Sequence, residues 1–292
     1  MVQNMEAMPP SVPAEEDMSQ WTKFGGGHLS ESYIHADGKT MMKLYFDFVR
    51  RDFIERELRV AEAAYAMGIS TPKPGETVRC GERLGNTFAC IADKRSFARA
   101  IADEPGKMKE YAERFAAMAK KLHETPADAS LVPSYRERLT ALIRQQTLLS
   151  TKEKKTLLRF LNSVEDTGTC LHGDLHIGNV VTDGTTDYFI DVGDLSHGNP
   201  LFDLGGFYIM SHVITDADCR ETYHISLAQH QMFWAFFLRE YFGADTPEKL
   251  VEADRRAKCF AALQALVYLD YDPSCTAFLR FVQKMIPEIK AS

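Results

Sequence analysis

Long apolar runs are absent from this sequence of 292 residues, and the longest unbroken one covers only residues 232–238. A helix that crosses a bilayer needs about 20 apolar residues, so we expect no membrane span. The first 20 residues contain no Lys or Arg, which argues against the basic start of a signal peptide. They hold four acids and three prolines. We therefore predict that residues 1–20 form an acidic, disordered tail and that the protein is cytoplasmic.

Two further absences narrow the class of protein. No block of basic residues occurs, and 34 Lys and Arg stand against 41 Asp and Glu, a net charge of −7. A nucleic-acid surface needs clustered cations to neutralise phosphates, so we expect no nucleic-acid partner. No Cys-x-x-Cys pair occurs either, which favours reduced thiols over disulfides or a zinc framework. The scattered cysteines are Cys80, Cys90, Cys170, Cys219, Cys259 and Cys275.

A strand-rich first part precedes a helix-rich remainder. Alternating apolar residues and turn dipeptides predict strands at residues 21–24, 32–35, 40–45, 76–80, 86–91, 180–182 and 188–190. Helical spacing predicts helices at residues 48–67, 109–123, 223–242, 247–269 and 276–286. We interpret the run 232–238 as a buried helix wall. A boundary is predicted between an N-terminal lobe, residues 21–94, and a C-terminal lobe, residues 95–292.

One short segment contains most of the residues that suggest chemistry. Residues 172–179 read His-Gly-Asp-Leu-His-Ile-Gly-Asn, and Asp191 follows on the far side of the predicted hairpin. Phosphoryl transfer needs such a set: a carboxylate that takes up the proton of a hydroxyl, and oxygen ligands for Mg²⁺. The alternative interpretation is a plain loop of turn-forming residues. That alternative does not explain two acid-bearing loops in this order.

These residues resemble the aminoglycoside phosphotransferase and choline kinase family of protein-kinase-like small-molecule kinases. The run 172–179 is similar to the catalytic-loop signature of that family, and Asp191 with residues 198–204 is similar to its metal-loop segment. The resemblance extends from about Phe24 to Tyr208. It implies an α+β, two-lobed protein-kinase-like fold, with a small antiparallel-sheet N-lobe containing one helix and a larger, mainly helical C-lobe.

The same resemblance implies roles for individual residues. Asp174 would be the catalytic base, and Asn179 and Asp191 would bind Mg²⁺. His172 and Asp203 would be structural supports, with Asp203 bracing the catalytic loop. ATP or GTP would be the phosphoryl donor.

The N-terminal part contains a candidate phosphate clamp. Gly25 to Gly27 followed by Ser30 has the Gly-x-Gly-x-x start of a kinase phosphate loop, which suggests Gly26, Gly27 and Ser30 as phosphate contacts. Three glycines before a strand are more often a simple turn, and the position of this loop ahead of the other motifs is what favours a phosphate loop. No Walker-type motif occurs, so a P-loop kinase is disfavoured.

Lys43 is a single charged residue in an otherwise apolar predicted strand. A charge that is buried there needs an anionic partner. The following helix offers Glu55 and Glu57, and the resemblance favours Glu57 as its partner. The alternative is an edge-strand lysine that faces water. Cys90 and Ala92, at the lobe connector, are also assigned to nucleotide binding. Lys94 stands where many relatives have Gly, which leaves the preference between ATP and GTP open.

Histidines in the chain allow other interpretations. His172 and His176 are four residues apart, but the glycines around them argue against a helix that would align them on zinc. His123 resembles a family Leu-His helix end beneath the catalytic loop, and it is equally explained as a helix-terminal histidine. His28 is interpreted as a solvated loop tip.

The predicted activity is Mg²⁺-dependent transfer of the γ-phosphoryl group of a nucleoside triphosphate to a hydroxyl of a small molecule. The acceptor stays open among aminoglycosides, choline-like alcohols and sugars. A protein kinase is one alternative, but residues 191–203 are too short for an activation segment, and no Ala-Pro-Glu anchor follows. A non-catalytic nucleotide-binding regulator of the same fold is the other. It would tolerate loss of the base or of a metal ligand, and neither is lost here.

Overall fold

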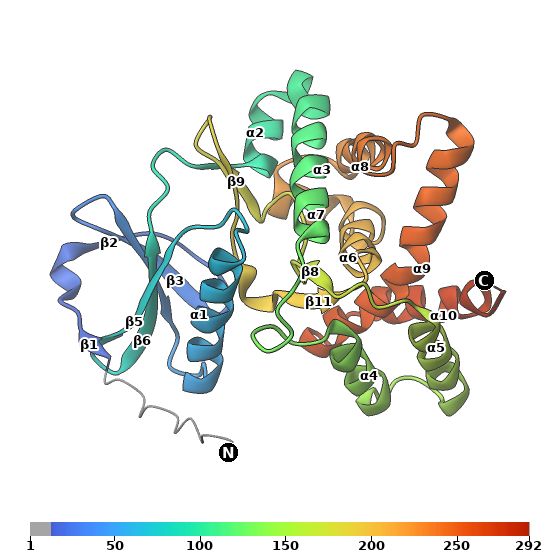
Figure 1. Cartoon of the computed structure of the whole chain (residues 1–292), viewed down its shortest axis with the longest axis horizontal. Helices are drawn as coiled ribbons and strands as arrows, with labels where there is room; N and C mark the ends of the chain where they lie inside the picture. The colour runs from blue at the N-terminus through green and yellow to red at the C-terminus, as the bar shows by residue number, and fades with distance from the viewer. Residues whose placement is uncertain (1–12, 292) are drawn as a thin grey trace, which may run out of the picture. The chain divides into compact units, whose positions relative to one another are not determined.

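A computed structural model describes residues 13–291, and these residues form two compact units (Figure 1). The first unit takes in the described chain up to Arg59 together with Pro72–Ala92. The second holds Val60–Thr71 and the chain from Asp93 onward. The sequence-based division placed the boundary after Lys94 and assigned residues 60–71 to the N-terminal lobe. The structure instead groups that segment, the end of helix α1 (Arg51–Ala66) and the loop after it, with the second unit.

The first unit is built on a six-stranded sheet with the strand order β1-β5-β6-β4-β3-β2. Its strands are β1 (Ala14–Glu15), β2 (Trp21–Gly26), β3 (Ser30–His35), β4 (Thr40–Tyr45), β5 (Pro74–Cys80) and β6 (Arg83–Ala89). All neighbours pair antiparallel except β1, which runs parallel to β5. The predicted small antiparallel sheet is confirmed, with one short parallel strand added at its edge.

That added strand corrects the prediction of a disordered tail. Ala14 pairs with Val78, and a 3-10 helix, η1 (Met18–Gln20), follows, with the Asp17 carboxylate capping its first turn. The exposed edge of β5 offers unpaired backbone groups, which an extended segment can satisfy whatever its charge. The prediction is therefore wrong for residues 14–20. Residues 1–12 lie outside the described residues.

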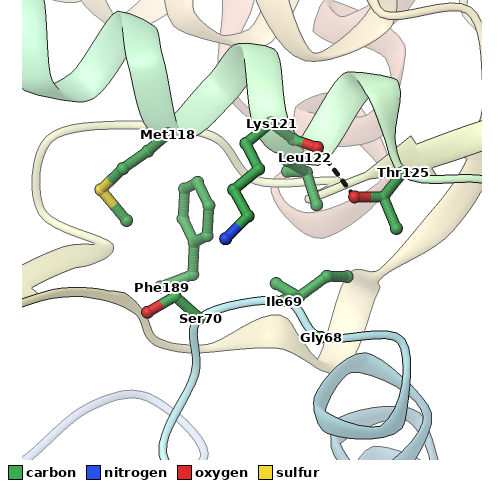
Figure 2. Close-up of a pocket in the computed structure, with 8 residues that line it drawn as sticks. All are labelled: Gly68, Ile69, Ser70, Met118, Lys121, Leu122, Thr125 and Phe189. Atoms are coloured by element: carbon green, nitrogen blue, oxygen red, sulfur yellow. Dashed lines mark hydrogen bonds between the residues drawn. The ribbon is translucent and has the colours of Figure 1, made fainter.

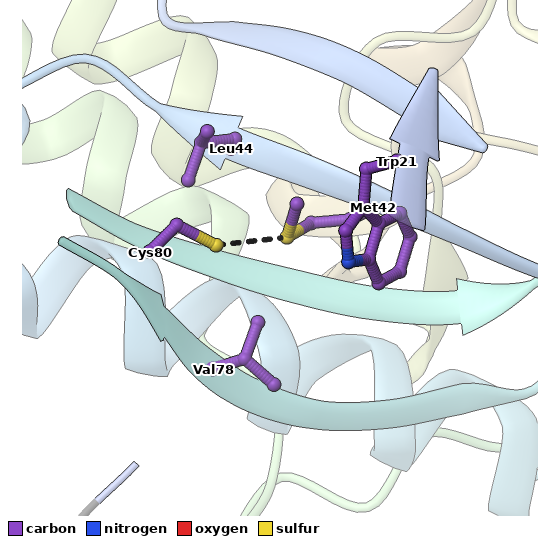
Figure 3. Close-up of a cluster of buried hydrophobic side chains, with 5 residues drawn as sticks. All are labelled: Trp21, Met42, Leu44, Val78 and Cys80. Carbon is purple, nitrogen blue, oxygen red and sulfur yellow. Dashed lines mark hydrogen bonds between the residues drawn. The ribbon is translucent and has the colours of Figure 1, made fainter. Parts of the chain in front are cut away.

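One face of this sheet carries a small apolar core (Figure 3). It consists of Trp21, Met42, Leu44, Val78 and Cys80. Met42 and Leu44 are two positions apart on β4, so the alternation of a strand sends both side chains to this face. The residue between them must point to the opposite face.

The second unit contains most of the helices. Its first elements are β7 (Arg95–Ser96), α2 (Phe97–Asp103), η2 (Pro105–Lys107), α3 (Met108–Glu124), α4 (Tyr135–Gln145), α5 (Thr151–Ser163) and β8 (Thr169–Leu171). They are followed by β9 (Val180–Thr182), β10 (Asp187–Phe189), η3 (Val192–Asp194), β11 (Ser196–Gly198), α6 (Leu201–His212), α7 (Asp216–Tyr223), α8 (Leu227–Phe242), α9 (Pro247–Tyr271) and α10 (Thr276–Ala291). Two small sheets, β10-β9-β7 and β11-β8, lie among these helices. These helices and small sheets, together with the sheet of the first unit, give the predicted α+β division into a small sheet-based part and a larger, mainly helical part.

Helix α8 begins later than predicted, and its start has a local cause. Ser226 caps it through a reciprocal pair of hydrogen bonds with Gln229, and His224, in a left-handed conformation, ends α7 just before it. The region predicted as one helix from residue 223 therefore contains a helix end, a turn and a new helix. Helices α2, α4, α5, α6 and α7 were not among those predicted from helical spacing.

The apolar run 232–238 forms part of α8, which packs against α3. Phe233, Trp234 and Phe237 are buried, and the rings of Phe115 and Phe207 contact them edge-on or tilted. The interpretation as a buried helix wall is confirmed for these residues and Leu238, whereas Met232, at the start of the run, is 54% exposed. No helix among residues 13–291 is long and apolar enough to span a membrane.

Candidate active site

Lys43 lies on β4 between Met42 and Leu44, on the face opposite the apolar core. Strand β4 is central, paired with both β3 and β6, so the alternative of an edge-strand lysine is wrong. The Nζ atom lies 2.5 Å from Oε1 of Glu57 on α1. Both side chains are largely buried, which favours an ordered ion pair over a loose surface contact.

Helix α1 is held to the sheet beside this pair. The amide of Asn86 on β6 donates to the Ile54 carbonyl of α1 at 2.9 Å and to the Tyr45 hydroxyl at 3.2 Å. Burial raises the pKa of the Tyr45 phenol well above its usual range, so this hydroxyl stays neutral. The Asn86 contacts fix the helix segment that presents Glu57.

The predicted phosphate loop joins β2 to β3. The Gly27 N–H donates to the Ser30 carbonyl at 2.8 Å, and Ser30 is buried at the start of β3. Gly26 lies close to the Ser30 backbone, whereas a Cβ at Gly27 would meet no heavy atom within 4 Å. In the described part of the chain, the N–H groups of His28 and Leu29 make no backbone hydrogen bond. These two amides lie at the exposed tip of the loop and were not among the predicted phosphate contacts. In the sequence, only the predicted turn could have indicated them.

The connector residues lie at the end of the first unit. The Cys90 N–H donates to the Lys39 carbonyl at 2.7 Å, and the Ala92 side chain is exposed. The next residue, Asp93, has φ +49°. The left-handed backbone therefore falls on Asp93, one position before Lys94.

The catalytic loop starts where β8 ends, and Asp203 braces it. Asp203 lies in the first turn of α6 and is almost fully buried. Its Oδ2 accepts the His172 N–H at 2.7 Å, and its Oδ1 accepts the Gly173 N–H at 2.8 Å. His123, at the end of α3, places Nε2 3.0 Å from Asp203 Oδ2 and Nδ1 2.7 Å from the Tyr241 hydroxyl. Both interpretations of His123 agree with the structure: it lies in the last turn of α3, and its ring contacts the carboxylate that binds the loop of Asp174.

Gly173 is required by the path of this loop. Its φ is +85°, and a Cβ would come within 2.3 Å of the Asp194 carbonyl oxygen. No other residue fits this approach without moving the chain. Asp194 is held from outside by Arg138, whose Nη1 lies 2.9 Å from Asp194 Oδ1. Sequence reasoning missed the Arg138–Asp194 pair because its members are far apart along the chain.

Asp174 is held by two neighbours from its own loop. The Asn179 side-chain amide donates at 3.0 Å both to the Asp174 carbonyl and to Asp174 Oδ2. His176 Nε2 lies 3.3 Å from the same Oδ2. Burial pushes the pKa of the Asp174 carboxyl upward, but the His176 ring and the hydrogen bonds outweigh it, so this pKa lies below its usual range. The carboxylate is ionised at neutral pH.

The loop that bears Asp191 is tied directly to the catalytic loop. Nε2 of His172 lies 3.1 Å from the Ile190 carbonyl oxygen, and the Ile190 N–H donates to the Asn179 carbonyl at 2.9 Å. Asp191 itself has φ +55°, an uncommon conformation for a non-glycine residue. Such strain is often found at functional sites. The structure thus places Asn179 and the residue before Asp191 in contact, as the hairpin prediction required.

Strand β10, which leads to Asp191, is fixed on two sides. The Ser70 hydroxyl donates to the Asp187 carbonyl at 2.6 Å, and the Phe189 N–H donates to the Ser70 carbonyl at 2.7 Å. The Arg114 guanidinium of α3 binds the Asp187 carboxylate, with Nε 3.0 Å from Oδ2. These contacts set the direction from which the chain enters the Asp191 loop.

A hollow lies between the loop after α1, helix α3 and Phe189 of β10, and it is lined by Gly68, Ile69, Ser70, Met118, Lys121, Leu122, Thr125 and Phe189 (Figure 2). Its lining is apolar apart from a few groups, and Lys121 extends from α3 toward Phe189. The Phe189 ring also contacts His172. None of the predicted catalytic or metal-binding residues lines this hollow.

The zinc alternative for His172 and His176 does not fit the geometry. Each imidazole has both ring nitrogens within hydrogen-bonding distance of protein atoms. Among the described residues, no group of three or more His, Cys, Asp or Glu side chains could hold a metal ion. An Mg²⁺ site of one amide and one carboxylate is a different donor set, and its oxygens are the hard ligands that this ion takes.

Comparisons with known proteins show the family and the fold of this chain. A family model described as "Phosphotransferase enzyme family" matches residues 20–237. A choline/ethanolamine kinase family protein from Mesorhizobium loti is 16% identical, with 93% of this chain and 87% of that chain covered and a TM-score of 0.53. Aminoglycoside phosphotransferase APH(4)-Ia is 14% identical, with coverage of 94% and 95% and a TM-score of 0.60.

A third similar structure is the ternary complex of APH(2'')-IIa with streptomycin and ATP. It is 15% identical, with coverage of 94% and 95% and a TM-score of 0.57. No match was found among curated protein sequences. At these identities the solved structures show the fold, whereas the family model covers well over half of the chain. The chain belongs to the phosphotransferase enzyme family.

Proposed function

We propose that this protein transfers the γ-phosphoryl group of ATP or GTP to a hydroxyl of a small molecule, with Mg²⁺ as the metal. The observation that carries the proposal is the ionised Asp174 carboxylate, held by Asn179 and His176 in a loop that Asp203 braces from below. In a phosphotransferase, such a carboxylate can take up the proton of the acceptor hydroxyl.

The first unit supplies the nucleotide-binding groups in this proposal. Lys43 holds the α and β phosphates, and Glu57 keeps its ammonium group in place. The loop from Gly26 to Ser30 contributes backbone amides, including those of His28 and Leu29. Cys90 and Ala92 contact the base. A similar structure, that of APH(2'')-IIa, contains ATP, which supports a nucleotide as the donor.

Asn179 and Asp191 would hold Mg²⁺. Because the Asn179 amide nitrogen donates to Asp174, the amide oxygen is the atom it would offer to a cation. Bound there, Mg²⁺ would neutralise the charge that develops on the transferred phosphoryl group.

The reaction needs no covalent intermediate with the protein. The hydroxyl oxygen of the acceptor forms a bond to the γ-phosphorus while the bond from that phosphorus to the β,γ-bridging oxygen breaks. The nucleoside diphosphate leaves, and the proton of the hydroxyl passes to Asp174. A loose phosphoryl transition state requires little proton removal early, so a carboxylate of low pKa can orient the hydroxyl and take its proton late.

The acceptor is proposed only as a small molecule with a hydroxyl. Aminoglycosides, choline-like alcohols and sugars are the classes to compare. The names of similar structures include an aminoglycoside complex and a choline/ethanolamine kinase family protein, which supports testing both classes.

The test combines a screen with one substitution. Hydroxyl-bearing metabolites and aminoglycosides are screened for phosphate transfer above the rate of nucleotide hydrolysis. For the best acceptor, Asp174→Asn should leave the affinity for Mg²⁺-nucleotide within a few-fold and lower the single-turnover rate by about 10² to 10⁴. A parental rate for Asp174→Asn would reject Asp174 as the base. Nucleotide binding without any acceptor would favour a non-catalytic regulator.

A further inference from the structure

His176 lies beside Asp174 in the predicted catalytic loop, and the proposed chemistry places it in contact with neither the nucleotide nor the metal. Its ring bridges two partners in that loop: the Gly178 N–H donates to Nδ1 at 3.0 Å, and Nε2 lies 3.3 Å from Asp174 Oδ2. Because Nδ1 accepts a hydrogen bond, the proton of a neutral imidazole must reside on Nε2. Nε2, which lies 3.3 Å from Asp174 Oδ2, is therefore the ring nitrogen that carries a proton beside this carboxylate.

The ring of His176 is fixed from the side as well. Tyr223, the last residue of α7, contacts it edge-on, with 5.4 Å between the ring centroids. A Cβ at Gly178 would come within 2.9 Å of two atoms of the imidazole, so only glycine leaves room for the ring there. Tyr223 is itself buried and packs on His230. The imidazole thus has one available position, set by α7 and by Gly178.

A carboxylate needs such support because its terminal torsion has no sharp preference. The second side-chain torsion of Asp is broad, so the plane of the Asp174 carboxylate would otherwise turn freely. Oδ2 accepts the Asn179 side-chain amide and lies 3.3 Å from Nε2 of His176. With Oδ2 occupied in this way, Oδ1 is the oxygen that can meet an acceptor hydroxyl.

We propose that His176 is a positioning residue, which holds the Asp174 carboxylate so that Oδ1 faces the hydroxyl of the acceptor. The inference rests on the proposed function, because it gives His176 a task only if Asp174 takes up that proton. Tyr223 and Gly178 in turn hold the imidazole of His176 in place.

The kinetic test uses Mg²⁺-ATP with water as the acceptor, so that it does not depend on the identity of the natural acceptor. His176→Ala should lower kcat about 10- to 100-fold with little change in the KM for Mg²⁺-ATP, because a misplaced group loses rate and not nucleotide binding. His176→Gln places an N–H near the position of Nε2 and should restore most of kcat. His197→Gln is the matched control, since His197 also lies beside a carboxylate, 4.0 Å from Asp166, but outside the loop. It should behave like the parent.

A purely structural role would not separate kcat from KM or be rescued by Gln. Parental kcat in His176→Ala, or equal loss in His176→Gln and His176→Ala, would overturn the inference. If His176→Ala does not fold, Gly178→Ala serves in its place: it keeps the imidazole but crowds it, and it should lower kcat to a similar extent.

A spectroscopic measurement makes the inference independent of turnover. NMR correlation spectra of the ring nitrogens should show His176 protonated on Nε2, with a resonance that shifts in Asp174→Asn. Protonation on Nδ1 alone would overturn the inference. Failure of the proposed function is distinguishable, because it would appear as a parent that neither binds nor hydrolyses Mg²⁺-ATP, or as a parental rate for Asp174→Asn.

Discussion

His123 and Asp203 meet beneath the catalytic loop, with Nε2 of the histidine 3.0 Å from Oδ2 of the aspartate, although 80 positions separate them in the sequence. The same carboxylate accepts the N–H groups of His172 and Gly173. One buried side chain therefore connects α3, α6 and the loop that bears Asp174.

Substitution Asp203→Ala should lower both stability and turnover. It leaves two buried backbone N–H groups without an acceptor, at about 1–3 kcal/mol each in the free energy of unfolding. Urea denaturation monitored by circular dichroism measures the change. Asp270→Ala, which removes an exposed carboxylate, is the control. Equal midpoints for Asp203→Ala and the parent would contradict the bracing role.

Substitution Lys43→Met should weaken the binding of Mg²⁺-ADP by about 10- to 100-fold, because a charge-assisted contact contributes about 1.5–3 kcal/mol. Glu57→Gln should have a smaller effect in the same direction, since it loosens the ammonium group without removing it. Isothermal titration calorimetry measures both. Lys23→Met, which breaks the more exposed pair with Glu31, should bind like the parent. The assignment fails if Lys43→Met and Lys23→Met bind equally well.

Replacement of Asp191 should remove the dependence of nucleotide affinity on Mg²⁺. Asp191→Gly is the sharper variant, because glycine adopts the left-handed backbone at φ +55° without strain and offers no side-chain oxygen to the metal. Nucleotide affinity is measured with Mg²⁺ and with EDTA. The two affinities should converge in the variant and differ in the parent. A parental response to Mg²⁺ in folded Asp191→Gly would exclude this residue as a ligand.

His230 should make the second unit sensitive to acid. Burial lowers the pKa of this imidazole to about 3, and among the described residues its Nε2 is one of two buried side-chain polar atoms without a hydrogen-bond partner. The folded state therefore holds the neutral form. The contribution of His230 to the free energy of unfolding is fully present above the unfolded-state pKa of about 6.5. It falls as the pH drops from there toward 3.

His230→Phe keeps a ring against Phe207 and Tyr223 but cannot take up a proton. Between neutral pH and about pH 5, the parent should lose about 2 kcal/mol in its free energy of unfolding through His230. The variant should not show this loss. Urea unfolding at both pH values gives the comparison, with His224→Asn, at an exposed position, as the control. An equal acid-induced loss in parent and His230→Phe would show that His230 is not the group responsible.

The local elements of the site could be predicted because their determinants are adjacent in the chain. Asp174 and Asn179 are five positions apart in one loop, so the loop itself brings the amide to the carboxylate. The turn at Asp183–Gly184 closes the hairpin that carries the chain to Asp191. Alternation along β4 separates Lys43 from its apolar neighbours, which is why a lone charge there indicated an anionic partner.

Contacts that hold these elements were decided by the tertiary structure alone. His123 with Asp203, Arg138 with Asp194, and Tyr223 with His176 join distant segments, and packing of several helices sets their positions. The regular structure within residues 14–20 likewise depends on a distant segment, because β1 pairs with the edge of β5. A local pattern determines which side chains a loop or strand presents, because backbone periodicity and turn geometry act over a few residues. Which distant side chain meets them depends on how whole elements pack, and no local pattern encodes that.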